Sequence, residues 1–317
     1  MKTSAVLASM ACSLAFGVVS FGVAHAAPPA QCHTIRLAFV GGPDNAVQNG
    51  VFTTIAETLG YKVSTNFFSE EILYAGLKNR QLDVFLDDWK PSMDSTTAPY
   101  VKEKAISVIG PDLTGAKYTL AVPAYLYQQG LHDFSDIHKF AKQLDHKIYG
   151  IEPGTSANRK LLGMIKDNSF DLGDFHLVQS SETGMFSALA RAYAQKRDIV
   201  FLGWEPAPMN VQYHIRYLSG GDKYFGSDKG SSTVYINTRF NYASECPNMG
   251  RFLRQFALGV DAENHMMYDI SVNHAQAPGV AAAWLKKNPG WIAATLKGVT
   301  TVDGKPAAPV VLHKLGA

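Results

Sequence analysis

The chain has 317 residues and carries 29 lysine and arginine residues against 27 aspartate and glutamate residues, a formal net charge of +2. This balance leaves no extended basic surface, so it argues against nucleic acid and against an anionic membrane surface as partners. The length suits one large domain or two domains of ordinary size.

The first 26 residues predict an export signal. They carry a single charged residue, and an apolar run leads into Ala24-His25-Ala26, which fits a small-x-small cleavage site. We therefore expect a periplasmic protein of 291 residues that begins at Ala27. The alternatives are an uncleaved membrane anchor and a lipoprotein attached through Cys12, although Ser9 stands where a lipoprotein signal has a large apolar residue. No later segment has about 18 unbroken apolar residues, so the mature chain is expected to be soluble.

Strands and helices alternate after the signal. Hydrophobic runs predict three strands and two intervening helices, in the order 34–40, 46–59 (helix), 61–68, 70–81 (helix) and 82–86. In the first helix Val47, Val51, Ile55 and Leu59 form one apolar stripe, and Gly60 ends the helix. This βαβαβ order predicts a parallel sheet covered by helices.

A second unit of the same kind begins near Lys117. We expect its elements at 117–123, 147–154, 158–167 (helix), 175–180, 183–196 (helix) and 198–204. After a glycine-rich return, the remaining elements are expected at 232–240 (strand), 249–260, 262–272 and 279–298 (helices), the last one interrupted at Asn288-Pro289-Gly290. The pattern predicts an α/β fold with two lobes, residues 27–116 plus 218–317 and residues 117–217. Because ligands of such sheets bind beyond the carboxyl ends of the strands, we expect a ligand cleft between the lobes, which a hinge can close.

Two phrases nearly repeat each other, "VFLDDWKPSM" at 84–93 and "VFLGWEPAPM" at 200–209. Each places a tryptophan at the end of a strand, Trp89 in the first lobe and Trp204 in the second. Either tryptophan alone suits a buried core role, but matching positions on opposite lobes favour two walls of the cleft. Tyr118, where the chain enters the second lobe, is the third expected wall. Such faces suit a trimethylammonium group, which is cationic but offers no N–H to a hydrogen-bond acceptor.

Two loops between a strand and a helix place polar side chains at the same cleft. Asp44 either caps the following helix or accepts a hydrogen bond from a ligand hydroxyl. Thr155 and Ser156 open a helix in the second lobe, where they either cap it or hold a polar ligand end.

The sequence contains no recognisable catalytic or metal-binding motif. The ten histidines do not fall into a metal-binding spacing, and no nucleophile elbow, phosphate loop or dinucleotide fingerprint is present. We therefore expect no catalytic residue, no metal and no cofactor. Trp284 and Trp291 follow helical periodicity and suit the core. The mature chain keeps Cys32 and Cys246, which an oxidising compartment favours as a disulfide, two buried free thiols being the alternative.

The whole mature chain resembles the choline- and glycine-betaine-binding periplasmic proteins of ABC importers, most nearly their choline-binding branch. The phrases that carry the resemblance are "LDVFLDDWKPSM", "GAKYTLA", "KIYGIEPGTSANR", "IVFLGWEPAPMN", "YLSGGD", "ECPNMGRFL" and "AAAWLKKNP". The resemblance implies a type II periplasmic binding protein fold, delivery of ligand to permease and ATPase subunits, and a monomer. It also implies an aromatic box of Trp89, Tyr118 and Trp204, a bond from Asp44 to the choline hydroxyl, and a Cys32–Cys246 disulfide.

Two positions depart from the choline-binding pattern. Gly42 stands where that pattern has a fourth aromatic wall, a tryptophan, and Thr155 stands where it has asparagine. The first change weakens a small trimethylammonium ligand or makes room for a bulkier one, such as carnitine, and glycine betaine is a further alternative. The pair Asp87-Asp88 adds negative charge that favours a cation. Candidates to fill the space beside Gly42 are Phe39, Phe68 and Tyr74. A periplasmic α/β enzyme remains the alternative from another class.

Overall fold

The computed structural model describes residues 28–317, so the predicted signal and its cleavage after Ala26 lie outside the described residues. The strands are β1 (Thr34–Phe39), β2 (Lys62–Phe67), β3 (Val84–Lys90), β4 (Ile106–Pro123), β5 (Lys147–Tyr149), β6 (His176–Val178), β7 (Phe201–Glu205), β8 (Ile215–Tyr217) and β9 (Ser231–Arg239).

Helices fill most of the connections between these strands. They are α1 (Pro43–Thr58), α2 (Glu70–Lys78), α3 (Asp94–Lys102), α4 (Ala124–Gln128), α5 (Ser156–Lys166), α6 (Glu182–Ala194), α7 (Pro208–Gln212), α8 (Asp222–Phe225), α9 (Ser227–Gly230), α10 (Tyr242–Glu245), α11 (Pro247–Gln255), α12 (Val260–Ser271), α13 (Ala277–Lys287), α14 (Pro289–Thr295) and α15 (Ala307–Leu315), with 3₁₀ turns η1 (Ala30–Cys32), η2 (Phe134–Phe140) and η3 (Ser169–Asp171).

One mixed sheet runs through the molecule in the order β2-β1-β3-β9-β4-β7-β5-β6, and β8 pairs with β4. At one end β1 is parallel to β2 and β3, and at the other β5 is parallel to β6 and β7. The predicted α/β fold is therefore confirmed, with parallel pairing at both ends of a mixed sheet. The two middle strands differ, because β9 is antiparallel to both β3 and β4, and β4 is antiparallel to β7.

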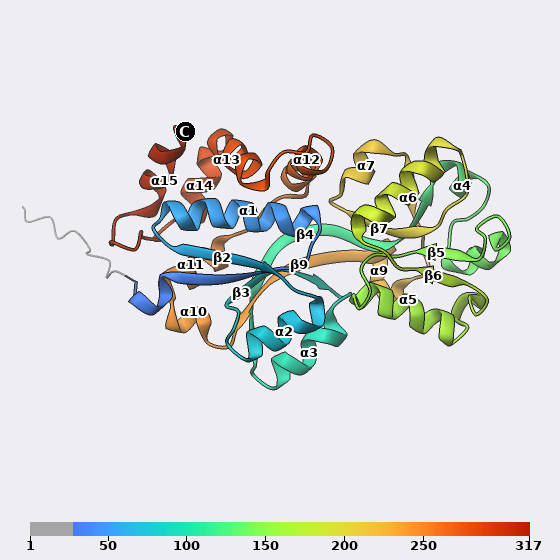
Figure 1. The fold of residues 1–317 in the computed structure, drawn as a ribbon, viewed down its shortest axis with the longest axis horizontal. Coiled ribbons are helices and arrows are strands. Elements are labelled where there is room, and N and C mark those ends of the chain that lie inside the picture. The colour runs from blue at the N-terminus through green and yellow to red at the C-terminus, as the bar shows by residue number, and fades with distance from the viewer. Residues whose placement is uncertain (1–27) are drawn as a thin grey trace, which may run out of the picture.

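The long strands β4 and β9 connect two halves of the molecule (Figure 1). We call the part around β1–β3 the first half and the part around β5–β7 the second half. Figure 1 shows α1 and α12–α15 on one face of the first half, and α2, α3 and α10 on the other. The predicted stripe of α1 is confirmed, since Val47, Val51 and Ile55 are buried, as is Leu59, which caps the end of the helix.

The proposed lobe boundaries stay a prediction, and the hydrophobic cores bear on them. The smaller core gathers side chains from the second half, among them Leu126, Phe134 and Leu161. Leu218 and Phe225 belong to this same core, although the sequence placed the return to the first lobe at residue 218. Their packing favours a return nearer residue 230, where β9 begins.

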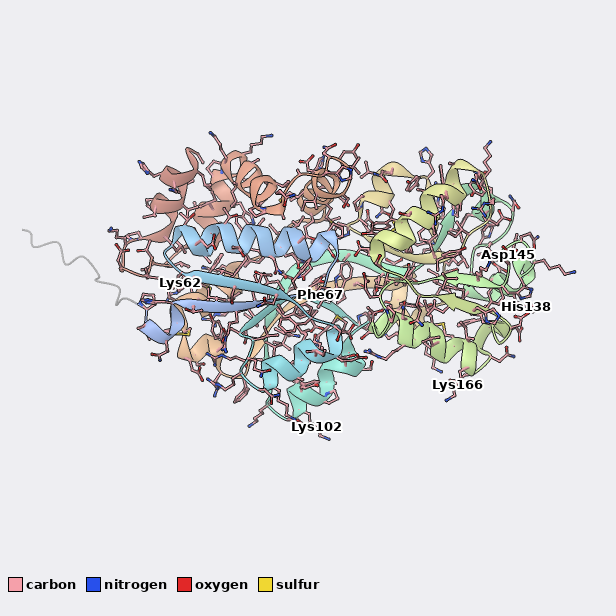
Figure 2. All side chains as sticks on the ribbon, in the orientation of Figure 1. Lys62, Phe67, Lys102, His138, Asp145 and Lys166 are labelled. Carbon is pink, nitrogen blue, oxygen red and sulfur yellow. A yellow bond between two sulfur atoms is a disulfide. The ribbon has the colours of Figure 1, made fainter. Side chains whose placement is uncertain are left out.

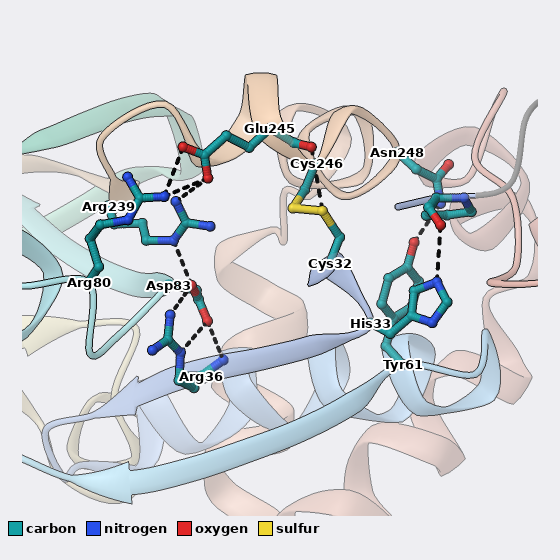
Figure 3. The surroundings of a disulfide bond; sticks show 11 residues. Cys32, His33, Arg36, Tyr61, Arg80, Asp83, Arg239, Glu245, Cys246 and Asn248 are labelled. Carbon is teal, nitrogen blue, oxygen red and sulfur yellow. Dashed lines mark hydrogen bonds and ion pairs between the residues drawn. A yellow bond between two sulfur atoms is a disulfide. The ribbon is translucent and has the colours of Figure 1, made fainter. Parts of the chain in front are cut away.

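The predicted Cys32–Cys246 disulfide is confirmed, with a Cα–Cα distance of 5.6 Å. It joins η1 to the start of α11, 214 residues later in the chain. Beside it, the Asp83 carboxylate accepts hydrogen bonds from Arg36 and Arg239, which lie on the strands flanking β3 in the sheet (Figure 3). The disulfide and the ion pairs together stabilise the end of the first half that lies farther from the second half.

Candidate ligand-binding site

A cavity of about 320 Å³ lies between the two halves. Five of the six residues predicted to meet the ligand line it: Asp44, Trp89, Tyr118, Thr155 and Trp204. Phe67, which precedes α2, also lines the cavity, and Figure 2 shows it where the two halves meet. The structure thus brings together side chains that the sequence spreads over about half of the chain.

Three aromatic rings lie next to one another on the cavity wall. Trp89 is the penultimate residue of β3, and Trp204 is the penultimate residue of β7. Tyr118 lies on β4, where it pairs with Trp204. The Tyr118 ring centroid is 5.4 Å from that of Trp89 and 6.0 Å from that of Trp204, with interplanar angles of 47° and 81°. Rings so tilted present faces in different directions around one space rather than forming a single flat wall.

The two tryptophans are held by different neighbours. The indole N–H of Trp89 donates to Asp87 at 2.6 Å, because residues 87 and 89 share one face of β3. The ring of Trp204 instead stacks on Phe186 of α6, with centroids 5.3 Å apart and planes at 30°. The Trp204 indole nitrogen is buried and has no hydrogen-bond partner among the described residues.

Asp44 lies in the first turn of α1 rather than at its N-cap, which is Gly42. Its Oδ1 accepts the backbone N–H of Asn45 at 2.8 Å. The pKa of Asp44 is raised to about 6, mainly by burial; the backbone hydrogen bonds oppose the rise, and the nearby charge of Glu152 adds to it. The carboxylate lines the cavity at a helix N-terminus, and no cationic side chain of residues 28–317 pairs with it.

Thr155 is the N-cap of α5 and also lines the cavity. Its hydroxyl accepts the N–H of Asn158 at 3.5 Å and donates to the Glu152 carbonyl at 3.0 Å. The Asn158 side chain closes the same loop by donating to the carbonyls of Ile151 and Glu152. The capping role expected as the alternative is therefore present, and the loop holds Thr155 at the cavity edge.

Gly42 does not line the cavity, although Gly41 does. A Cβ atom built on Gly42 would lie 2.5 Å from Asp44 Oδ1 and 2.6 Å from Glu182 Oε2. The place of the expected fourth wall is thus held by two carboxylates. None of Phe39, Phe68 and Tyr74 lines the cavity, whereas Phe67 and Phe85 do.

The sequence indicated acidic charge at Asp44 and Asp87, and both line the cavity. It did not indicate Glu70, Glu152 and Glu182, which come from other elements and line the cavity as well. Burial raises the pKa of Asp87 and of Glu182 well above the usual range of a carboxyl group, and the charge of Asp44 adds to both shifts. Asp88 points to the other face of β3, where it accepts a hydrogen bond from Asn237 at 2.9 Å. The cavity is therefore apolar on its aromatic side and acidic elsewhere.

A group of contacts that we call the Arg159 clasp lies along one side of the cavity, where Glu70 and Ser156 line it. The Arg159 guanidinium on α5 reaches Glu70 and Glu71 of α2, each at 3.0 Å, and Thr96 of α3 at 2.6 Å. The Glu70 carboxylate also accepts the backbone N–H of Ser156 at 2.9 Å and the Ser156 hydroxyl. The clasp joins the two halves through charge-assisted hydrogen bonds.

Within residues 28–317, no three or more histidine, cysteine, aspartate or glutamate side chains are arranged to hold a metal ion. No helix in that range is long and apolar enough to span a membrane.

Comparison with known proteins agrees with this architecture. The chain is 42% identical to an ABC-transporter choline-binding protein in complex with choline, with a TM-score of 0.89 over 91% of this chain and 100% of that chain. The unliganded, semi-closed conformation of such a protein gives 42% identity and a TM-score of 0.83 over 90% of this chain and 100% of that chain.

A further relative is the glycine betaine/carnitine transport binding protein GbuC of Listeria monocytogenes, 29% identical over 164 residues. That match covers 51% of this chain and about half, 53%, of the relative's own length. The family model for the substrate binding domain of ABC-type glycine betaine transport systems matches residues 33–287. The resemblance read from the sequence is confirmed, and the enzyme alternative is set aside. The chain belongs to this OpuAC family of substrate-binding domains.

Proposed function

We propose that the chain captures a small quaternary ammonium compound, choline first, and delivers it to the permease and ATPase subunits of an ABC importer. The observation that carries the proposal is the convergence of Trp89, Tyr118 and Trp204 on one cavity. An aromatic face attracts a cation through its quadrupole and covers its methyl groups, at about 0.5–2 kcal/mol for each contact. The similarity to a choline complex supports the same ligand class.

The remaining roles follow from this ligand. Asp44 accepts a hydrogen bond from the choline hydroxyl, Thr155 shapes the loop at the cavity edge, and Gly42 leaves room for the acidic side chains beside it.

The proposal also includes export to the periplasm after cleavage at Ala26, and action as a monomer. We further propose that the two halves act as lobes that close on the ligand, with β4 and β9 as the connecting strands.

A different methylated amine on the same scaffold is the second candidate. The name of the Listeria relative points to glycine betaine and carnitine, and position 42 lacks the aromatic side chain that the choline-binding pattern has there. Both candidates predict that the aromatic rings carry the affinity, so they differ in the ligand and not in the site.

Calorimetric titration with choline, glycine betaine, carnitine and a panel of amino acids tests the proposal. We expect one methylated amine to bind in a saturable manner, with an affinity near micromolar, about −8 kcal/mol. Trp89→Ala and Trp204→Ala are each expected to weaken that binding at least about a hundredfold, or about 2.7 kcal/mol. Trp89→Phe, which keeps an aromatic face, serves as the matched control and should retain most of the affinity. Near-wild-type binding by both alanine variants would contradict the aromatic box.

A further inference from the structure

Glu182 occupies the place of the absent aromatic wall. It is the first residue of α6 in the second half, and its Oε2 lies against the same point beside Gly42 as Asp44 Oδ1 from the first half. The two carboxylates therefore approach each other across the boundary between the halves. The glycine permits this approach because a side chain at position 42 would overlap both oxygens.

The side chain of Glu182 also has an oxygen without a hydrogen-bond partner among the described residues. The residue is 8% exposed, and its buried Oε1 accepts no hydrogen bond from the described part of the chain. Its backbone N–H is satisfied, since it donates to Glu152 Oε1 at 2.9 Å. A buried polar atom with no partner is costly, so a group that enters the cavity and donates a hydrogen bond to it is favoured.

The other acidic side chains of the cavity are better satisfied. Glu70 is bound by Arg159 and Ser156, Asp87 accepts the Trp89 indole, and Asp44 accepts the Asn45 N–H. Glu182 is therefore the cavity carboxylate whose side chain accepts no hydrogen bond from residues 28–317. Burial and the charges of Asp44 and Glu152 raise its pKa, which agrees with that lack of a donor.

We propose that Glu182 is a specificity-determining residue that selects a cation with a hydrogen-bond donor and rejects ligands that carry a carboxylate. The inference rests on the proposed function, because it concerns the same cavity and the same class of ligand. The aromatic rings cover the methylated end of the ligand, and its donor end lies between the carboxylates of Glu182 and Asp44. A betaine-type zwitterion places its own carboxylate against these two groups in a site of low dielectric, where like charges repel strongly.

Three probes separate charge from hydrogen bonding. Choline carries a positive charge and a hydroxyl donor, its methyl ether keeps the charge and lacks the donor, and glycine betaine adds a carboxylate. Calorimetry at pH 7.5 compares their affinities for the full mature chain, for Glu182→Gln and for Glu57→Gln. Glu57 is an exposed carboxylate on α1, so the last variant is a matched control.

We expect the unaltered protein to bind choline at least a hundredfold more tightly than glycine betaine, and at least tenfold more tightly than the methyl ether. Glu182→Gln should reduce the choline-to-betaine ratio about tenfold, whereas Glu57→Gln should leave it unchanged. A reduction of less than threefold in Glu182→Gln overturns the inference, as does an unaltered protein that binds glycine betaine as tightly as choline. If Glu182→Gln does not fold, Glu182→Ala, which also removes the carboxylate, is measured in the same way, and the same threefold limit applies.

The outcomes also separate the inference from the proposed function. If choline binds and Trp204→Ala abolishes binding, but Glu182→Gln does not change the ratio, only the role of Glu182 is wrong. If no methylated amine binds the unaltered protein, both proposals fail.

Discussion

The two halves of the molecule meet on both sides of the cavity, and the chemistry of the two contacts differs. On one side the Arg159 clasp joins a guanidinium to Glu70 and Glu71, so opposite charges and hydrogen bonds satisfy each other. On the other side Asp44 and Glu182 bring two carboxylates together beside Gly42. The first contact holds the halves together without a ligand, whereas the second repels until a cation or a proton enters.

Under the proposed function, this difference separates closure from recognition. The clasp favours closure, because its charged partners are all present among the described residues. The acidic side and the aromatic rings carry the proposed recognition, because the positive charge there comes from the ligand. A site in which every contact were satisfied would close equally well with and without its ligand, and ligand-dependent closure needs such an imbalance.

The largest expected effect concerns the disulfide. It lies outside both contacts and serves as a reference for the predictions that change them. Replacing both Cys32 and Cys246 by serine removes a bond that spans 214 residues, and we expect the free energy of unfolding to fall by about 2–5 kcal/mol. Ligand affinity should stay within about twofold, because the disulfide lies at the far end of the first half. Denaturant unfolding and calorimetry measure the two quantities. A large loss of affinity would mean that stability and recognition are not separable in this fold.

The second prediction breaks the acidic contact. The raised pKa of Asp44, about 6 in place of 3.8, means that the folded state holds its proton more tightly than the unfolded state. Its stabilising contribution is present below pH 3.8 and is lost as pH rises through about 6. The free energy of unfolding of ligand-free Asp44→Asn, relative to that of the unaltered protein, should therefore be about 2–3 kcal/mol larger at pH 7 than at low pH.

Ligand binding should show the opposite dependence on pH. A cation favours the ionised carboxylate, so choline affinity should rise severalfold from pH 5 to pH 7.5 in the unaltered protein and less steeply in Asp44→Asn. Thermal melts with and without choline, at several pH values, measure both effects. Parallel pH profiles for the two proteins would show that Asp44 does not titrate in this range. Asp87 and Glu182 face the same space. Burial and the charge of Asp44 raise the pKa of each, so both groups also contribute to the pH dependence.

The third prediction breaks the Arg159 clasp. Arg159→Ala removes the charge that links α5 to α2, and we expect choline affinity to fall about tenfold, or about 1.4 kcal/mol, since the side chain is 38% exposed and partly screened. Arg254→Ala, which changes an exposed arginine on α11, is the control. Small-angle scattering should show a larger radius of gyration for ligand-free Arg159→Ala than for the control. An unchanged radius and affinity would contradict a closing role.

An effect of similar size is expected at Gly42. An alanine there must adopt φ near +79° and place its Cβ against Asp44 and Glu182, so Gly42→Ala should cost about 1–2 kcal/mol of stability. Gly41→Ala also forces a positive φ, +99°, but its Cβ would meet only Phe67 at 3.5 Å. The difference between the two variants therefore isolates the crowding of the carboxylates, and equal costs would show that the crowding is relaxed in solution.

The parts of this picture that could be predicted from the sequence are those with a local signal. The stripe of Val47, Val51 and Ile55 located α1, and the repeated phrases located Trp89 and Trp204 at strand ends. Elements interrupted by glycine or proline gave weaker signals. The first part of β4, which contains Gly110, Pro111 and Gly115, and the helix α3, which contains Pro99, were not predicted.

The acidic contact had no local signal at all. Glu182 lies 140 residues after Gly42, and nothing in the sequence near either residue indicates that they meet. The sequence indicated a missing wall at Gly42 and suggested aromatic replacements, but tertiary packing supplied a carboxylate. The Arg159 clasp was missed for the same reason, because its partners come from three helices on two halves.

The disulfide has a consequence for how the protein is made. The covalent ring between Cys32 and Cys246 encloses every residue assigned to the ligand, from Asp44 to Trp204. On the proposed export route, Cys32 crosses the membrane long before Cys246. The native disulfide can then form only after all of the proposed ligand-binding residues have crossed. A truncated product that ends before Cys246 therefore keeps a free thiol at Cys32, and this thiol distinguishes it chemically from the full-length protein.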